Sequence, residues 1–523
     1  MKKKLPIGIQ TFSEIVTEGY YYVDKSYYAH KLISEGKHYF LSRPRRFGKS
    51  LFLDTLKELF EGNQKLFKGL YIYDKWDWSV IYPVIVIDFA GGVLQSRREL
   101  DERICKILRS NQLKLGLEPN NDDNVVSLFE DTILNLFKKY GRRVVVLVDE
   151  YDKPIIDNIE SQDVAAQMRD GLKNLYSVFK SEDAHIQFVF MTGVTKFSKV
   201  SLFSGINQLI DITLDENFST ICGYTDDELK LYFAEHLKGV DWDKLQTWYN
   251  GYKWLGDISV YNPYDLLMFI HKNFSYRNYW FETGNPNFII KLFEKSHYFL
   301  PALENIEVTE SILNSFDVEK IDPITLLFQS GYLTIDSTFT RRDRLIFCLK
   351  IPNNEVKIAL NDLLIDGYTG KNPSNRTHFQ DELYRSLKTG NISGITGVIE
   401  RLFASIPWRN FTKNSIADSE GYYASVLYAL FSSLDAQVIP EDITNHGQVD
   451  MTVKFGQNIY VVEVKLVDTD NPDELGSNPA LKQIQEKKYA QKYKSRAGVV
   501  VHEVGLVFSR KLRNLLVWDA VTH

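Results

Sequence analysis

The chain has 523 residues, of which 44% are hydrophobic and 25% charged, and its formal net charge is -6 at pH 7. This composition is ordinary for a globular protein, the length fits about two to four domains, and the acidic balance excludes a uniformly basic nucleic-acid binder. The three cysteines form no C-x-x-C pair, and no apolar run approaches the roughly 18 residues of a membrane span. We therefore expect a cytoplasmic protein with no membrane partner, in which any contact with nucleic acid is local.

Four short apolar runs are separated by helical patterns in the first part of the chain. They are rich in Val, Ile and Phe, which is typical of buried parallel strands between helices. The runs are HYFLS (38–42), VIVIDFA (84–90), VVVLVD (144–149) and IQFVFMTG (186–193). They predict an α/β domain over residues 1–215, with a parallel sheet and crossover helices.

The first run leads into a candidate phosphate-binding loop, FLSRPRRFGKS (40–50). A phosphate cradle needs backbone N–H groups at a helix N-terminus, a lysine for the outer phosphates and a hydroxyl for magnesium, and Gly48, Lys49 and Ser50 supply these. The Walker A pattern requires glycine where this chain has Arg43, so we expect the bend to rely on Pro44, whose φ is fixed. The alternative interpretation of Gly-Lys-Ser is the basic start of an ordinary helix.

The middle of the loop adds Arg45, Arg46 and Phe47 to the predicted nucleotide-binding stretch. The two arginines are open to several interpretations: contacts to phosphate, contacts to nucleic acid or to a neighbouring subunit of a homo-oligomer, or a solvated basic loop. We predict that the whole stretch 43–50 binds the nucleotide.

Two other strand ends carry polar residues suited to ATP hydrolysis. Asp149 and Glu150 end the run 144–149, where Asp149 would hold magnesium together with Ser50 and Glu150 would polarise the attacking water. Thr192, at the end of the run 186–193, is placed to sense the γ-phosphate, although a strand-terminating turn is the alternative. Together with the loop, these residues predict a site for ATP and Mg2+.

Several motifs resemble those of the bacterial AAA-ATPase-like family. They are RPRRFGKS, VDEYDKP, TGVTKFSKVSLFSG, WYNGYKW, VYNPYDLL and YWFETG, with GIQTFSEI and YVDKS near the start, and they cover most of residues 6–300. The family's loop resembles R-P-R-R-F-G-K-S itself, so the resemblance implies that Arg43 is a family trait and that the loop is a nucleotide site. It also implies an AAA-type P-loop fold.

The pattern changes to helical segments separated by aromatic turns from about residue 216 to 370. Its periodicity is compatible with a helical lid and with a helical and winged-helix connector, and it does not choose between them. The stretch GKNPSNRTH (370–378) clusters Gly, Pro, Asn and Ser without apolar periodicity and is predicted to be a linker. A last domain over residues 375–523 follows.

The last domain contains a predicted β-hairpin with a two-residue type II′ turn at Gly456-Gln457. In this register, residues whose numbers sum to 913 lie opposite each other, so Asp450 faces Glu463. A one-residue slip would mix apolar and polar faces. The predicted apolar face consists of Val449, Met451 and Val453 opposite Val464, Val462 and Tyr460.

Directly opposed carboxylates repel each other unless a cation lies between them. Mg2+ favours oxygen ligands and is the expected occupant between Asp450 and Glu463, and Lys465 would activate water or hold the phosphate. A hairpin of this kind alone is also compatible with a surface salt-bridge ladder.

The D-x12-E-x-K arrangement resembles the PD-(D/E)XK nuclease superfamily, which implies an α/β nuclease-like domain. By this resemblance Glu420 adds a metal ligand, Gln483 supports the site, and Tyr489 packs or contacts the substrate backbone. Gln485 and Tyr489 also satisfy a Q-x-x-x-Y spacing, which leaves the choice of glutamine open. Six Lys or Arg stand against one Glu in residues 480–496, predicted as one helix, and form the local basic surface.

These features predict an ATPase whose nucleotide cycle moves or assembles a magnesium-dependent nuclease on nucleic acid, with DNA as the first candidate. Two other classes of function stay open. One is an ATP-dependent switch or scaffold whose nuclease-fold domain binds nucleic acid without cleaving it. The other is an ATPase that acts on protein partners and uses the last domain for docking.

Overall fold

The computed structural model describes residues 2–197, 202, 208–281, 303, 306–314, 322–369, 373–406, 419–434, 436–494 and 498–523. The chain forms two compact units, Met1–Thr283 with Glu307–Asn353, and Gly284–Ile306 with Asn354–His523. The predicted divisions near 215 and 370 do not coincide with the limits of these units, so the three-domain division stays a prediction of the sequence. Parts of the motifs TGVTKFSKVSLFSG and YWFETG lie outside the described residues.

The first unit contains a parallel sheet whose strands are β1 His38–Ser42, β2 Val84–Asp88, β3 Val144–Asp149, β4 Ile186–Gly193 and β5 Ile210–Asp211. Their order is β2-β3-β4-β1-β5, and the neighbouring strands run parallel. All residues of β1 and β3 are buried, because a sheet covered on both faces needs apolar side chains on both sides. The α/β prediction from the four apolar runs is confirmed.

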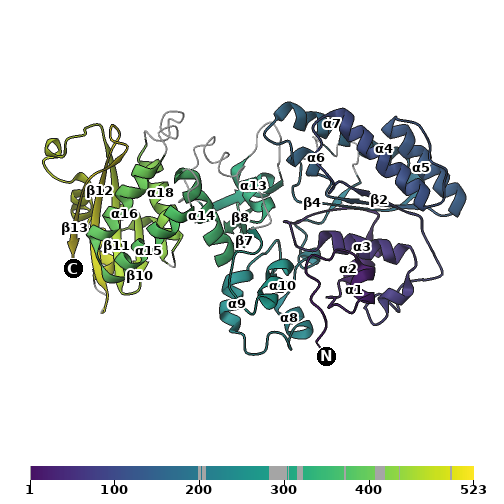
Figure 1. The fold of residues 1–523 in the computed structure, drawn as a ribbon, viewed down its shortest axis with the longest axis horizontal. Coiled ribbons are helices and arrows are strands. Elements are labelled where there is room, and N and C mark those ends of the chain that lie inside the picture. Colours follow the sequence, from purple (N-terminus) through teal and green to yellow (C-terminus); the bar gives the residue numbers. More distant parts are fainter. Residues whose placement is uncertain are drawn as a thin grey trace. The chain divides into compact units, whose positions relative to one another are not determined.

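Helices cover both faces of this sheet (Figure 1). One face carries α1 Phe12–Thr17, α2 Ser26–Glu35 and α3 Lys49–Phe60, and the opposite face carries α4 Arg97–Lys114, α5 Val125–Tyr140 and α7 Gln162–Ser181. The short helix α6 Lys153–Ile156 precedes α7. Because β4 lies between β1 and β3, the carboxyl ends of these three parallel strands meet at one edge of the sheet. This edge is where ligands bind in open α/β folds.

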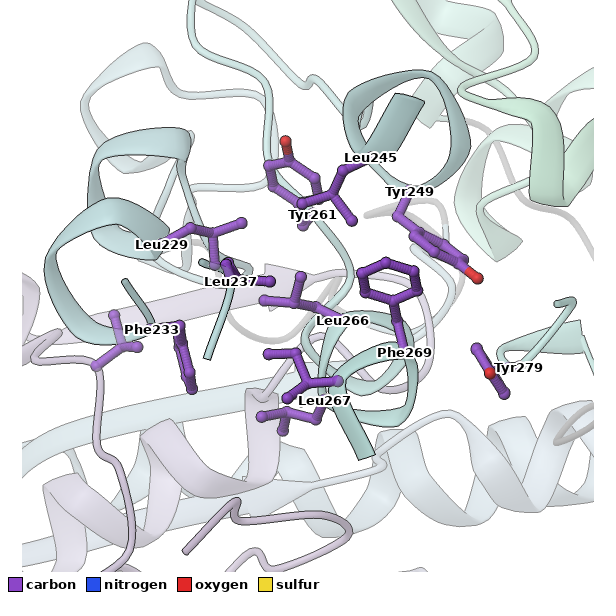
Figure 2. Packing of buried hydrophobic residues seen from close by; sticks show 12 residues of the cluster. Leu229, Phe233, Leu237, Leu245, Tyr249, Tyr261, Leu266, Leu267, Phe269 and Tyr279 are labelled. Carbon is purple, nitrogen blue, oxygen red and sulfur yellow. The ribbon is translucent and has the colours of Figure 1, made fainter. Parts of the chain in front are cut away.

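A group of helices follows the sheet in the first unit: α8 Asp226–Tyr232, α9 Trp242–Tyr249 and α10 Pro263–His271. Their starts are set by local side chains, since Thr225 and Glu228 form a capping box at α8 and the Asn262 side chain accepts the Tyr264 N–H at α10. Figure 2 shows Leu266 and Leu267 of α10 in the same interior as side chains from α8 and α9. This buried cluster holds the three helices together.

The rest of the first unit is not purely helical. It contains α12 Glu310–Asn314, α13 Pro323–Ser330 and a sheet of β6 Ile306–Thr309, β7 Thr334–Arg341 and β8 Arg344–Lys350, in the order β6-β8-β7. Of the two predicted connector types, the one with a winged-helix part agrees with this hairpin of β7 and β8. The purely helical alternative is wrong.

The second unit is built around a mixed sheet of β9 Gln437–Thr444, β10 Gly447–Phe455, β11 Asn458–Val467, β12 Val500–Ser509 and β13 Asn514–Thr522, in the order β13-β12-β11-β10-β9. Only β11 and β12 pair in parallel among the described strands of this sheet. Its helices are α14 Asn354–Thr369, α15 Pro373–Thr389, α16 Ile392–Ser405, α18 Glu420–Ser432, α19 Pro479–Glu486 and α20 Gln491–Lys494. The α/β prediction for the last domain is confirmed.

Two local predictions in this unit are wrong. The predicted linker 370–378 is helical from Pro373 onward, because its polar side chains pair with the preceding helix: Arg376 bonds to Asp366 of α14. The predicted helix 480–496 ends at Glu486 and resumes at Gln491. Lys488 in between has a left-handed backbone, φ 51°, which turns the chain toward the sheet.

No helix in the described part of the chain combines the length and the apolar character that a membrane crossing requires.

Candidate active sites

The loop between β1 and α3 turns at two residues with left-handed backbones, Arg46 with φ 69° and Gly48 with φ 94°. Gly48 is the N-cap of α3, and glycine adopts this conformation without the steric cost that a side chain brings. Pro44 lies before both residues and is buried. The sharp bend is therefore not at Pro44, contrary to the prediction.

Arg43 is fully buried and points away from the loop's interior. Its guanidinium donates to the backbone oxygens of Thr213 at 2.9 Å and Phe218 at 3.2 Å. It also lies 4.0 Å from the centre of the Trp254 ring. Burial lowers the pKa of Arg43 to about 10. These contacts of Arg43 hold the start of the loop in place, which explains how the loop keeps its shape without the first glycine of the Walker A pattern.

A cavity of about 490 Å³ opens beside this loop. Arg45, Arg46 and Phe47 through Ser50 line it, whereas Arg43 and Pro44 do not. The predicted direct contact of Arg43 and Pro44 with the nucleotide therefore has no counterpart in the geometry. Because both exposed arginines face the cavity, the phosphate interpretation of Arg45 and Arg46 is the one this geometry favours.

The Lys49 side chain forms hydrogen bonds with the backbone of its own loop. Its ammonium donates to the backbone oxygens of Arg43 at 2.9 Å and of Pro44 at 3.0 Å. Burial lowers the pKa of Lys49, while the charge of Asp149 acts in the opposite direction. A buried cation whose hydrogen bonds go to carbonyl oxygens, with the carboxylates of Asp149, Asp152 and Glu150 in its surroundings, is suited to an anionic ligand.

The acidic pair predicted from the sequence lies at the same edge of the sheet. The Asp149 carboxylate accepts hydrogen bonds from the Thr192 hydroxyl and, at 3.0 Å, from the Glu150 N–H. Glu150 lines the cavity and has φ 50°, a strained backbone for a residue with a side chain. Burial, and then the charge of Asp149, raises the pKa of Glu150. The structure brings Lys49, Asp149, Glu150 and Thr192 together.

Sequence reasoning missed other residues of this cavity. Asp152, buried two positions after Glu150, lines it, and so does Lys153. The far side is formed by segments distant in sequence, which only the family-like motifs GIQTFSEI, YVDKS and VYNPYDLL could have pointed out. These lining residues are 6, 8–10, 21–23, 25, 221–224, 263, 264 and 267.

The hairpin of the second unit has the predicted register. Met451 pairs with Val462, Val453 with Tyr460 and Phe455 with Asn458, so the numbers sum to 913 throughout. Gly456 has φ 58° while Gln457 is not left-handed, as a type II′ turn requires. Val449 does not belong to the predicted apolar face. It packs instead in a cluster with Val461 and Ile484 of α19.

Asp450 and Glu463 face each other, and each carboxylate takes a backbone N–H from the opposite strand. Asp450 accepts from the Val464 N–H at 2.7 Å, and Glu463 accepts from the Asp450 N–H at 3.3 Å. Burial raises the pKa of Asp450. Burial and the charge of Asp450 raise the pKa of Glu463 to about 7. Glu463 is buried and Asp450 is partly buried. Two opposed carboxylates in this situation fit a divalent cation, since Mg2+ is commonly held by one or two carboxylates.

Lys465 connects this pair to Glu420. Its ammonium lies 3.1 Å from Glu463 and 3.6 Å from Glu420, which also accepts the Leu466 N–H at 3.3 Å. Although burial alone would lower the pKa of Lys465, the carboxylates of Glu463 and Glu420 raise it. Within the described residues, no three His, Cys, Asp or Glu side chains form a group able to hold a metal ion. The metal-ligand role of Glu420 therefore stays a prediction.

Gln483 of α19 donates a hydrogen bond to Glu463, while Gln485 is exposed. Between the two glutamines left open by the spacing, the geometry thus favours Gln483. Tyr489 is buried in the cluster beneath the sheet and packs instead of facing solvent. In the basic stretch, Lys492 and Lys494 are paired with acids of the same unit, and Lys487 and Lys488 are exposed.

Comparisons with known proteins identify the two domains in which these residues lie. Residues 6–203 match the family described as predicted AAA-ATPase, and residues 418–518 match a family of the PD-(D/E)XK nuclease superfamily. A protein of Azotobacter chroococcum mcd 1, described as an uncharacterized protein in the vnfD 5′ region, is 46% identical over 517 residues, 98% of each chain. An AAA-ATPase-like and a nuclease-superfamily domain are therefore both present.

Lys49→Ala is expected to abolish ATP binding or hydrolysis, because it removes the cation that the loop holds for the outer phosphates. Hydrolysis by the full chain should fall by about 100-fold or more in kcat/KM. Lys65→Ala, which changes an exposed lysine outside the cavity, is the control. Unchanged hydrolysis in Lys49→Ala would mean that Gly-Lys-Ser is only the basic start of a helix.

Glu463→Gln is expected to stabilise the protein at pH 8 in metal-free buffer. The pKa of Glu463 rises from 4.5 to about 7 on folding, so the folded state loses stability as pH rises through that window. Glutamine does not ionise, so the variant avoids burying a negative charge. The gain in unfolding free energy should therefore be about 1–3 kcal/mol at pH 8 and vanish toward pH 4.5.

The measurement is thermal or urea unfolding of the full chain across this pH range. Glu486→Gln, on the exposed side of α19, is the matched control and should show no pH-dependent gain. A clear loss of stability in Glu463→Gln at pH 8 would instead identify the hairpin as a salt-bridge ladder.

Proposed function

Because the chain belongs to a family that joins an AAA-ATPase-like domain to a PD-(D/E)XK nuclease-superfamily domain, we propose that it hydrolyses ATP and thereby controls phosphodiester cleavage of nucleic acid. The observation that carries the cleavage half is the opposed pair Asp450 and Glu463 with Lys465 beside it. The cavity around Lys49 and Glu150 carries the ATPase half.

In the first site the chain's own residues have separate tasks. Lys49, with Arg45 and Arg46 on the cavity wall, binds the phosphates. Asp149 and Ser50 would hold the Mg2+ of the nucleotide, which supplies positive charge at the phosphates. Glu150 orients water and takes up its proton, a task that a carboxylate of raised pKa performs well.

In the second site Asp450 and Glu463 would hold Mg2+, which provides charge at the scissile phosphate and favours ionised water. Gln483 keeps Glu463 in place through its hydrogen bond. Since the neighbouring carboxylates raise the pKa of Lys465, this side chain stays an ammonium ion and neutralises phosphate charge instead of accepting a proton. Of the two roles considered for Lys465, holding the phosphate is the better supported.

The proposed substrate is nucleic acid, with DNA as the first candidate. The net charge of -6 requires a local contact surface, and the exposed Lys482, Lys487 and Lys488 beside α19 provide positive charge near the second site. We place the protein in the cytoplasm, where its three free thiols stay reduced.

Contacts inside the first unit support a link between the phosphate loop and the point where the chain enters the second unit. The Phe47 ring meets the rings of Tyr252 and Trp254 edge-on, with centroids 4.8 Å and 5.4 Å away. In the same segment the Asn250 backbone oxygen accepts from the Asn353 side chain at 2.9 Å. Asn353 directly precedes α14, so a shift of the loop can reach this junction through packed side chains.

The first test is cleavage of a panel of single- and double-stranded DNA and RNA by the full chain with Mg2+ and ATP. Lys465→Ala should abolish cleavage and leave ATP hydrolysis unchanged, because the lysine lies only in the second site. Lys388→Ala, which changes an exposed lysine of α15 outside the proposed contact surface, is the control for general loss of charge. Salt-sensitive DNA binding without cleavage by the unmodified chain would favour the scaffold function instead.

The second test concerns the link between the two activities. Asn353→Ala should leave ATP hydrolysis intact and remove the effect of ATP on cleavage, because it breaks the bond to Asn250 at the junction. Asn361→Ala is the matched control, since Asn361 is an equally buried amide that donates to the Ser432 backbone oxygen inside the second unit. If ATP still changes cleavage to the same extent in Asn353→Ala, coupling does not pass through this contact.

A further inference from the structure

Asp152 lies two residues beyond Glu150, and the proposed chemistry leaves it without a task. Its carboxylate is buried, with 2% of the residue exposed. It accepts hydrogen bonds from the Val194 N–H at 3.0 Å, the Thr195 N–H at 2.6 Å and the Thr195 hydroxyl at 2.6 Å. Burying a carboxylate is costly, and here the cost is offset by three donors from one short segment.

That segment, residues 192–195, contacts both Asp149 and the start of the phosphate loop. The Thr192 hydroxyl donates to the Asp149 carboxylate. The Gly193 backbone oxygen accepts from the Arg43 N–H at 3.2 Å, and the Val194 oxygen accepts from the Ser42 hydroxyl at 2.5 Å. The position of this segment therefore sets the distance between the phosphate loop and the acids after β3.

The turn that carries Asp152 packs tightly against residues 192–195. The Tyr151 N–H donates to the Thr192 oxygen at 3.0 Å. A Cβ atom on Gly193 would come within 2.5 Å of the Tyr151 ring and 2.6 Å of the Asp152 carboxylate, so only glycine fits there. Contacts this close define one arrangement of the two strand ends.

We propose that Asp152 is a positioning residue for ATP hydrolysis. By holding Val194 and Thr195, it keeps Thr192 on the Asp149 carboxylate and keeps the start of the phosphate loop against the end of β4. It acts through these residues and does not itself touch the reacting atoms. The proposal rests on the proposed ATPase function.

The test is Asp152→Asn in the full chain, measured as kcat and KM for ATP, ATP affinity and thermal stability. The amide keeps the size of the side chain and one acceptor oxygen, but it removes the negative charge to which the three donors point and puts an NH2 donor in place of the second oxygen, which now faces the Val194 N–H at 3.3 Å. We expect kcat to fall by about 10- to 100-fold while KM and ATP affinity change by less than about threefold. Glu150→Gln gives the reference for losing the chemical step alone.

Thr195 supplies the conservative comparison. Thr195→Ser keeps the hydroxyl and should retain the kcat of the unmodified chain, whereas Thr195→Val removes one of the three donors and should lower kcat in the same way as Asp152→Asn, to a smaller extent. If Asp152→Asn fails to fold, the Thr195 pair decides the matter with the same measurements.

The outcomes separate the two proposals. An unmodified chain that hydrolyses no ATP overturns the proposed ATPase function, and this inference with it. If the unmodified chain is active, either of two results overturns the inference alone. One is an unchanged kcat in Asp152→Asn and Thr195→Val. The other is a joint fall of kcat, ATP affinity and thermal stability, as a purely structural role requires.

Discussion

Buried charged side chains are the constraint on which both sites depend. A charge removed from water must be matched by hydrogen-bond donors, acceptors or opposite charges, and these partners leave few possible arrangements. Lys49 is held by carbonyl oxygens, Asp152 by three donors, and Glu463 by a backbone N–H, Gln483 and Lys465. Each site is therefore already shaped by the protein's own charges, and its ligands complete the compensation.

The two sites use this constraint in different ways. In the first, parallel strands bring the phosphate loop, Asp149 and Thr192 to one edge, and the segment after β4 lies between the loop and the acids. In the second, an antiparallel hairpin places Asp450 and Glu463 face to face, where burial raises the pKa of both carboxyls and the charge of Asp450 adds to the rise at Glu463. The first site is fixed mainly by hydrogen bonds, and the second brings two like charges close together.

Local patterns predicted much of this arrangement. Buried strands such as β1 and β3 were evident because covered parallel strands are apolar throughout. The hairpin register was predictable because a two-residue turn at Gly456-Gln457 allows only one pairing of the strands. Long-range partners were not predictable. The role of Arg43 depends on carbonyl oxygens at Thr213 and Phe218, the helix at Pro373 depends on acids of α14, and the break at Lys488 depends on the core that Tyr489 joins.

In the proposed function, nucleotide bound in the first unit controls cleavage by the second. The most direct measurement is the rate at which the full chain with Mg2+ cleaves end-labelled DNA without nucleotide, with ADP, with ATP and with a non-hydrolysable ATP analogue, alongside Asp450→Asn. We expect rates that differ among the nucleotide states and cleavage that disappears in Asp450→Asn. Equal rates in all four states, or cleavage that survives Asp450→Asn, would contradict it.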